Sequence, residues 1–354
     1  MIYAINIAAV ILYGIITRII FREKWKSVFI FIATIHLALF HALRNPFDYP
    51  DNALYYDAYK EISGYDFKEC FFELHSFTSW EPGYVLLNFL LSHINPNPSL
   101  LFICSSVFMV VGNMVIIKKL SYNPLLSVLI YMIYPLMFGQ SLFVLRQHIA
   151  TVFVLLSVLY VNQSVKSLIY ILLAISFHYS AIVILPFILF YRKLFELQPI
   201  RLCFIALSII IAGHVIMPFI VELFPRFAAY TERENNIIPF IILSSLFLLH
   251  IINGSLFKAR DCNDRIILGF LLYGVLISLL MLGVPGGGRL TNYLIYILPV
   301  AFPLLFKLTG LASNFIFKVI YSMAFFCLII YLCIDSNIFL YNYSFFWEEH
   351  RFIN

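Results

Sequence analysis

Charged residues are scarce in this chain, and their scarcity excludes a soluble protein. Of the 354 residues, 12% are charged and 62% are hydrophobic, whereas soluble domains carry about 25% charged residues. The apolar runs are about 20 residues long, which is enough for a helix to cross a bilayer core of roughly 30 Å. The composition therefore predicts an all-α polytopic membrane protein, with residues 1–354 forming a single integral membrane domain.

Cysteine motifs and metal-binding patterns are also lacking. The six cysteines are scattered and form no CxxC pair, and no HxxH or HxxxH pair has a carboxylate nearby. We therefore expect no metal site and no cofactor. The net charge of +5 does not indicate a nucleic-acid partner, because the basic residues lie between the apolar runs.

No basic residue precedes the first apolar run, so we interpret it as a membrane span with its N-terminus outside and not as a signal peptide. The basic linker that follows, Arg22 to Lys26, is expected in the cytoplasm. This orientation places the 44–81 and 222–236 loops outside. It also places Lys118-Lys119, the Lys258–Arg265 connection and most of the 23 Lys and Arg residues inside.

The apolar runs predict about 10–12 transmembrane helices. Spans are expected near residues 2–20, 27–43, 99–117, 124–138, 149–162, 202–221, 237–256, 266–283, 289–306 and 315–333. Residues 82–94 would give a helix of only about 20 Å, so they are interpreted as a re-entrant or half-helix after the outer loop. Residues 167–191 have basic residues at both ends, which favours a hairpin of two short helices with His178 at the outer tip.

The longest polar segment runs from Arg44 to Tyr84 and contains eight of the 18 acidic residues together with a tyrosine cluster. These acidic residues are Asp48, Asp51, Asp57, Glu61, Asp66, Glu69, Glu73 and Glu81. Acids and aromatic rings gathered in one water-facing loop indicate where the polar chemistry takes place. We expect residues 44–81 to form one wall of a sugar-binding site on the outer face.

Five arginines before the C-terminal tail fall on the predicted outer side: Arg44, Arg146, Arg226, Arg233 and Arg289. Arginine binds phosphate through two parallel hydrogen bonds and stays charged in a low-dielectric site. Arg146 and Arg289 follow short turns at the apolar boundary, so we expect them to approach each other and bind an anionic group such as phosphate. The alternative interpretation is that these side chains snorkel to lipid headgroups.

His178, Asp51 and Glu81 are candidates for acid–base chemistry. The imidazole or either carboxylate is able to accept a proton from a sugar hydroxyl. The structural alternatives are a histidine that links two helices by hydrogen bonds and a solvated acidic loop. Loop aromatics such as Tyr55 and Trp80 are able to stack on sugars, or they belong to an interfacial aromatic belt.

The arrangement of these residues resembles the EpsG-type membrane proteins, which include many Wzy-type O-antigen and capsular polysaccharide polymerases. The matching pieces are Arg44 with Asp51 and Tyr55, Glu81-Pro82-Gly83-Tyr84, Leu145-Arg146-Gln147 with Ala150, Phe177-His178-Tyr179-Ser180-Ala181, and Arg289 with Tyr293. The interval after Arg44 lacks the glycine usual in that family. Either Asp48 or Asp51 is therefore the family acid, and the position of Tyr55 favours Asp51.

The resemblance implies a glycosyltransferase of the bacterial inner membrane that polymerises undecaprenyl-pyrophosphate-linked oligosaccharide repeat units, as in lipopolysaccharide or capsule synthesis. It implies Asp51, Glu81 and His178 as catalytic residues. The residues that it implies for substrate binding are Arg44, Tyr55, Tyr84, Arg146, Gln147, Arg289 and Tyr293. The expected partners are the lipid-linked oligosaccharides, membrane lipids and a chain-length regulator protein.

Two other classes of protein share some of these features. A transporter or flippase for a glycolipid or polar solute would also contain broken helices and buried arginines. The helix-breaking elements here do not form two related halves, which disfavours a transporter. A membrane acyltransferase would centre on a histidine with an acid or asparagine nearby, for which His178 is the available residue.

Overall fold

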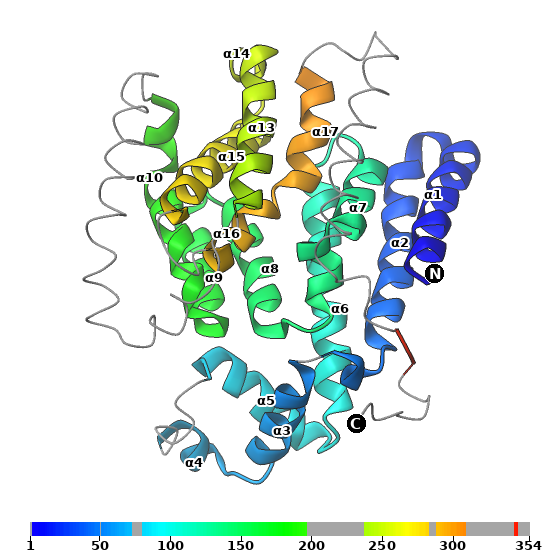
Figure 1. The fold of residues 1–354 in the computed structure, drawn as a ribbon, viewed down its shortest axis with the longest axis vertical. Coiled ribbons are helices and arrows are strands. Elements are labelled where there is room, and N and C mark those ends of the chain that lie inside the picture. The colour runs from blue at the N-terminus through cyan, green and yellow to red at the C-terminus, as the bar shows by residue number, and fades with distance from the viewer. Residues whose placement is uncertain are drawn as a thin grey trace.

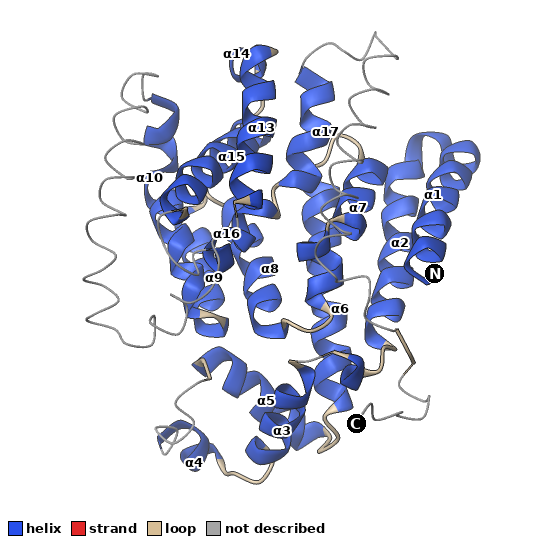
Figure 2. Cartoon of the chain, viewed as in Figure 1, coloured by secondary structure: helices blue, strands red, loops and turns tan. Residues whose placement is uncertain are grey.

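The structure, a computed structural model, describes residues 2–49, 51–72, 80–196, 237–282, 288–308 and 343–345. Its described elements are helices, apart from one isolated bridge between Arg44 and Phe345 (Figure 2). This confirms the predicted all-α class. The expected spans 202–221 and 315–333, the 222–236 loop, Arg226 and Arg233 lie outside the described residues.

Among the residues that the structure describes, four apolar helical stretches are long enough to cross a membrane, namely Ile2–Ala42, Ser99–Leu120, Cys262–Met281 and Leu290–Leu308. The first stretch consists of α1 (Ile2–Phe21) and α2 (Trp25–Ala42). The short turn η1 (Arg22–Lys24) connects the two helices, which pack side by side. Their outer surfaces expose large apolar side chains such as Ile19 and Phe31. Contiguous apolar surface of this extent suits contact with lipid, so the chain is a multi-pass membrane protein.

The rest of the bundle combines long helices with shorter apolar ones. Its elements are α6 (Ser99–Leu120), α7 (Pro124–Ile133), η3 (Pro135–Gly139), α8 (Leu145–Leu159), α9 (Ser164–Phe177), η4 (Tyr179–Ile184), α10 (Leu185–Glu196), α13 (Ile238–Ile252), α14 (Ser255–Lys258), α15 (Cys262–Met281), α16 (Gly288–Ile295) and α17 (Leu298–Leu308). The span expected at 124–138 is interrupted, because Tyr134 precedes a proline and adopts an extended backbone. The span expected at 289–306 is likewise divided into α16 and α17.

The basic turns of the bundle gather at one end. Lys26 donates to the carbonyl of Tyr122 at 3.1 Å, which joins the α1–α2 turn to the α6–α7 turn. Lys307 at the end of α17 donates to Asp261 at 2.6 Å and to Asp264, next to the start of α15. Figure 1 shows this end opposite to the group formed by α3, α4 and α5. The side of the membrane that each end faces stays a prediction.

The segment around His178 forms the predicted helical hairpin. Helix α9 ends at Phe177, His178 adopts an extended backbone with φ −158° and ψ 113°, and η4 follows. Both η4 and α10 pack against α9. The structure therefore confirms a break in the chain at His178 and excludes a single straight helix over 167–191.

The polar segment folds into short helices below the bundle: η2 (Pro46–Asp48), α3 (Asn52–Ile62), α4 (Phe67–Phe72) and α5 (Pro82–Ile94) (Figure 1). Helix α3 packs against α5 with one apolar face. Helix α4 begins with a reciprocal capping box, in which Asp66 and Glu69 each accept a backbone N–H from the other, at 2.7 and 2.8 Å. These helices present the Trp80–Tyr84 segment to the bundle.

Candidate functional site

Glu81 is held in place by the proline that follows it. Pro82 occupies the first turn of α5, so Glu81 is the extended residue before the helix, with φ −72° and ψ 147°. The side chain of Glu81 is buried, with 4% of its surface exposed. A carboxylate at a helix N-terminus is stabilised by the helix dipole, so this position suits a permanently charged acid.

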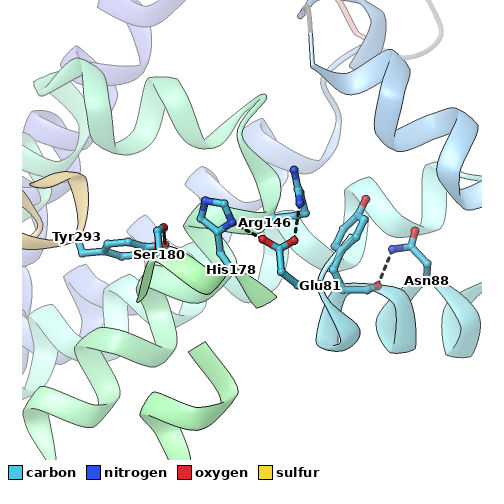
Figure 3. A network of polar contacts seen from close by, with 7 residues as sticks. Glu81, Asn88, Arg146, His178, Ser180 and Tyr293 are labelled. Carbon is cyan, nitrogen blue, oxygen red and sulfur yellow. Dashed lines mark hydrogen bonds and ion pairs between the residues drawn. The ribbon is translucent and has the colours of Figure 1, made fainter. Parts of the chain in front are cut away.

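The hairpin tip brings His178 to this carboxylate. The Nδ1 atom of His178 lies 2.6 Å from Oε1 of Glu81 (Figure 3). The side chain of His178 is 22% exposed. With Nδ1–H donating to a carboxylate, a neutral imidazole has its lone pair on Nε2. His178 is thus oriented to accept a proton through Nε2.

Arg146 approaches the same carboxylate from the other side. It lies in the first turn of α8, and its Nη1 donates to Oε2 of Glu81 in a salt bridge. Glu81 therefore joins His178 of the hairpin to Arg146 of α8, as Figure 3 shows. Arg146 is thus paired with a buried carboxylate, and its expected contact with a phosphate group stays a prediction.

The two partners keep Glu81 ionised. Burial raises the pKa of the Glu81 carboxyl, but the hydrogen bond from His178 and the charge of Arg146 together outweigh burial, and the pKa lies below its ordinary value. At neutral pH the carboxylate is therefore charged. It acts as a fixed acceptor for His178 and Arg146, and a proton that leaves the substrate would go to another group.

Aromatic rings surround the Arg146 guanidinium. Its central carbon lies 4.5 Å from the centroid of the Trp80 ring and 6.0 Å from that of Tyr84. The Tyr55 hydroxyl forms a hydrogen bond with Arg146, and the rings of Tyr55, Trp80 and Tyr84 pack together with centroids 5.3–5.8 Å apart. Cation–π contacts hold the guanidinium plane in one orientation. Tyr55 and Tyr84 thus contact Arg146, and their expected contact with substrate stays a prediction.

Gly83 explains why α5 approaches α9 so closely. A Cβ atom at position 83 would lie 2.8 Å from the backbone oxygen of Ser176 and would also contact its Oγ. Ser176 is two residues before His178, so this contact fixes the distance between the two chain segments that carry Glu81 and His178. The Glu81-Pro82-Gly83 sequence thus sets the conformation of the acid and the closeness of the helices.

Replacing Gly83 with Ala should separate α5 from α9 and weaken the Glu81–His178 hydrogen bond. We expect a loss of about 1–3 kcal/mol of folding stability, typical of overpacking, and lower activity. Thermal unfolding of the purified protein measures the first effect. Gly64→Ala is the matched control, because a Cβ there meets only the Glu61 carbonyl at 3.5 Å. Equal unfolding temperatures for both variants would contradict this account.

Tyr293 and Arg289 belong to α16. The Tyr293 hydroxyl lies 2.9 Å from Oγ of Ser180, two residues after His178, so α16 is tied to the hairpin tip (Figure 3). Arg289 is in the first turn of α16, four residues before Tyr293, but its side chain lies outside the described part of the structure. The expected approach of Arg146 and Arg289 therefore stays a prediction. Gln147 follows Arg146 and is buried, and its role in substrate binding also stays a prediction.

Arg44 takes a different place from the one expected. Its side chain is buried, and it donates to the Leu142 carbonyl at 2.9 Å, to Oγ of Ser106 at 2.7 Å and to Nδ1 of His41 at 3.0 Å. These contacts join α2, α6 and the segment before α8. The guanidinium has almost no accessible surface and links these three segments. Its expected contact with substrate stays a prediction.

The structure also separates the two candidate aspartates. Asp48 accepts hydrogen bonds from the backbone N–H and the Oγ of Ser344, at 2.7 and 2.6 Å, and so fixes the 343–345 segment. Asp51 precedes α3 and lies near Tyr55. Burial raises the pKa of the Tyr55 hydroxyl, Arg146 opposes this shift and the charge of Asp51 adds to it. Of the two acids, Asp51 is the one near Tyr55, which contacts Arg146.

Several residues that build the site carry only a weak signal in the sequence. Trp80 directly precedes Glu81, which marks it as a neighbour of the site but does not reveal its stacking on Arg146. Ser176 and Ser180 flank His178 and become recognisable only through their contacts with Gly83 and Tyr293. All three roles depend on segments that are far apart in the chain.

Comparison with known proteins identified one family. A model of the EpsG family matches residues 27–345, which include Glu81, Arg146 and His178. No curated protein and no solved structure matches the chain.

Proposed function

The chain belongs to the EpsG family, and from this premise we propose that it polymerises undecaprenyl-pyrophosphate-linked oligosaccharide repeat units of O-antigen or capsule. In this proposal the protein is a glycosyltransferase of the bacterial cytoplasmic (inner) membrane, acting on its outer face. It transfers a growing glycan from one lipid carrier to the sugar end of the next carrier-bound unit. A chain-length regulator is a further proposed partner.

The observation that carries the proposal is the bridge formed by Glu81 between His178 and Arg146. Glycosyl transfer from a pyrophosphate needs a group that takes a proton from the acceptor hydroxyl and a cation that stabilises the leaving group. An imidazole oriented by a carboxylate suits the first task. An arginine held between aromatic rings suits the second.

In the proposed reaction, Nε2 of His178 accepts the proton of the acceptor sugar hydroxyl. The hydroxyl oxygen forms a bond to the anomeric carbon of the donor glycan, and the bond from that carbon to the pyrophosphate oxygen breaks. The pyrophosphate leaves with the electron pair, and Arg146 neutralises its charge. Glu81 holds the imidazolium that results. Asp51, close to Tyr55, is a proposed contact for sugar hydroxyls.

A membrane acyltransferase is the second candidate, because the hydrogen bond between His178 and Glu81 would also activate a hydroxyl for acyl transfer. The two reactions differ in what Arg146 does. Acyl transfer has no pyrophosphate leaving group, so a charged and rigidly held guanidinium beside the base favours glycosyl transfer.

Deletion of the gene followed by gel analysis of surface glycans tests the proposal. A ladder that collapses to one repeat unit supports a polymerase. Loss of all surface glycan indicates a flippase. A normal ladder whose sugars lack acyl groups indicates an acyltransferase. Restoration of the ladder by the wild-type gene is the control for effects on neighbouring genes.

A further inference from the structure

The guanidinium that the pyrophosphate needs is already engaged by Glu81. The Nη1 atom of Arg146 donates to Oε2 of Glu81, and the centroid of the Trp80 ring lies 4.5 Å from the central carbon of the guanidinium. Glu81 and Trp80 therefore already occupy part of the guanidinium that a phosphate would contact. A phosphate group carries more charge than a carboxylate and accepts the same two-pronged hydrogen bonds. The two anions therefore compete for one cation.

Glu81 differs from an ordinary salt-bridge partner because it has a second donor. If Arg146 turns to a phosphate, the carboxylate keeps its hydrogen bond to His178, at 2.6 Å. Removing the only partner of a buried charge is strongly unfavourable, but here the carboxylate keeps one hydrogen-bond donor. The structure thus makes the release of Arg146 much less costly than the loss of an isolated ion pair.

We infer that the donor pyrophosphate displaces Glu81 from Arg146, and that Glu81 is an internal competitor that holds the guanidinium until the donor binds. The inference rests on the proposed function. After the exchange, Glu81 has His178 as its remaining partner among these three residues. The carboxylate then holds the imidazolium that forms when Nε2 takes the proton of the acceptor hydroxyl, so binding of the donor is coupled to the acceptor step.

The test is the affinity of the purified full-length protein for undecaprenyl pyrophosphate, measured in nanodiscs without an acceptor. Glu81→Gln removes the competing charge, so it should bind undecaprenyl pyrophosphate on the order of tenfold more tightly, although it should extend chains more slowly. Asp57→Asn is the matched control, because Asp57 is an exposed acid of α3. Its affinity should stay within about twofold of wild type.

A second variant tests the exchange in the opposite direction. His178→Gln weakens the alternative partner of Glu81, so the carboxylate should hold Arg146 more firmly and undecaprenyl pyrophosphate should bind several-fold more weakly. This measurement decides the question if Glu81→Gln does not fold. Unchanged or weaker binding by folded Glu81→Gln, or unchanged binding by His178→Gln, would overturn the exchange alone. Failure of the wild-type protein to bind undecaprenyl pyrophosphate would overturn the proposed donor as well.

Discussion

Replacement of His178 by Ala should slow chain extension by about 10²–10⁴-fold, the usual contribution of a positioned general base. His178 contacts Glu81 through Nδ1, and Nε2 is the atom that would take the proton of the acceptor hydroxyl. The salt bridge between Glu81 and Arg146 remains in this variant, so the protein should fold. The measurement is the rate of glycan extension by purified protein supplied with lipid-linked repeat units.

His93→Ala is the matched control for this variant. His93 is exposed on α5 and its Nδ1 contacts the Phe89 carbonyl of its own helix at 2.9 Å, so its replacement should leave extension unchanged. Normal extension by His178→Ala, with normal protein level, would show that His178 only links the hairpin to α5. In that case Asp51 would become the leading candidate for the base.

Replacement of Arg146 by Lys should reduce chain extension about ten- to a hundredfold, although the positive charge is kept. Lysine lacks the planar fork that pairs with phosphate, and in the structure this fork lies over the Trp80 ring. Loss of a charge-assisted hydrogen bond costs about 1.5–3 kcal/mol, which corresponds to this range of rates. Arg146→Ala should impair extension more, because it removes the positive charge as well as the two-pronged contact.

Arg192→Lys is the control for the charge-conserving change, since Arg192 is exposed on α10. It should extend chains at the wild-type rate. If Arg146→Lys makes long chains normally, the two-pronged contact with phosphate is not required. If Arg146→Ala also does so at normal protein level, Arg146 serves only to hold Glu81 and the aromatic rings.

The helical class and the approximate positions of the membrane helices were predictable because they follow from local chemistry. A run of apolar residues near 20 in length has few alternatives to a spanning helix. The hairpin at His178 was predictable from basic residues at both ends of the segment. The interruption after Ile133 was missed, because an apolar run conceals the effect of Pro135 on the residue before it.

The site was predictable as a set of residue types but not as a set of contacts. Glu81, Arg146 and His178 were all candidates, yet the sequence contained no sign that one carboxylate bridges the other two. Arg44 illustrates the opposite case. It has the same charge and a similar position at the edge of an apolar run as Arg146, but its surroundings bury it among the Leu142 carbonyl, Ser106 and His41.

By itself the sequence determined that this protein is a membrane-embedded helical bundle with an acidic and aromatic segment at one end. Composition and the length of the apolar runs are sufficient for this, because a long apolar segment is stable in lipid when it forms a helix. Only the tertiary structure decided which polar groups meet. Glu81 and His178 are 97 residues apart, and their contact depends on Gly83 allowing α5 to approach the end of α9. Contacts of this kind arise from helix packing. The missing Cβ atom of Gly83 sets the distance between α5 and α9, and this distance cannot be predicted from the sequence pattern of either helix.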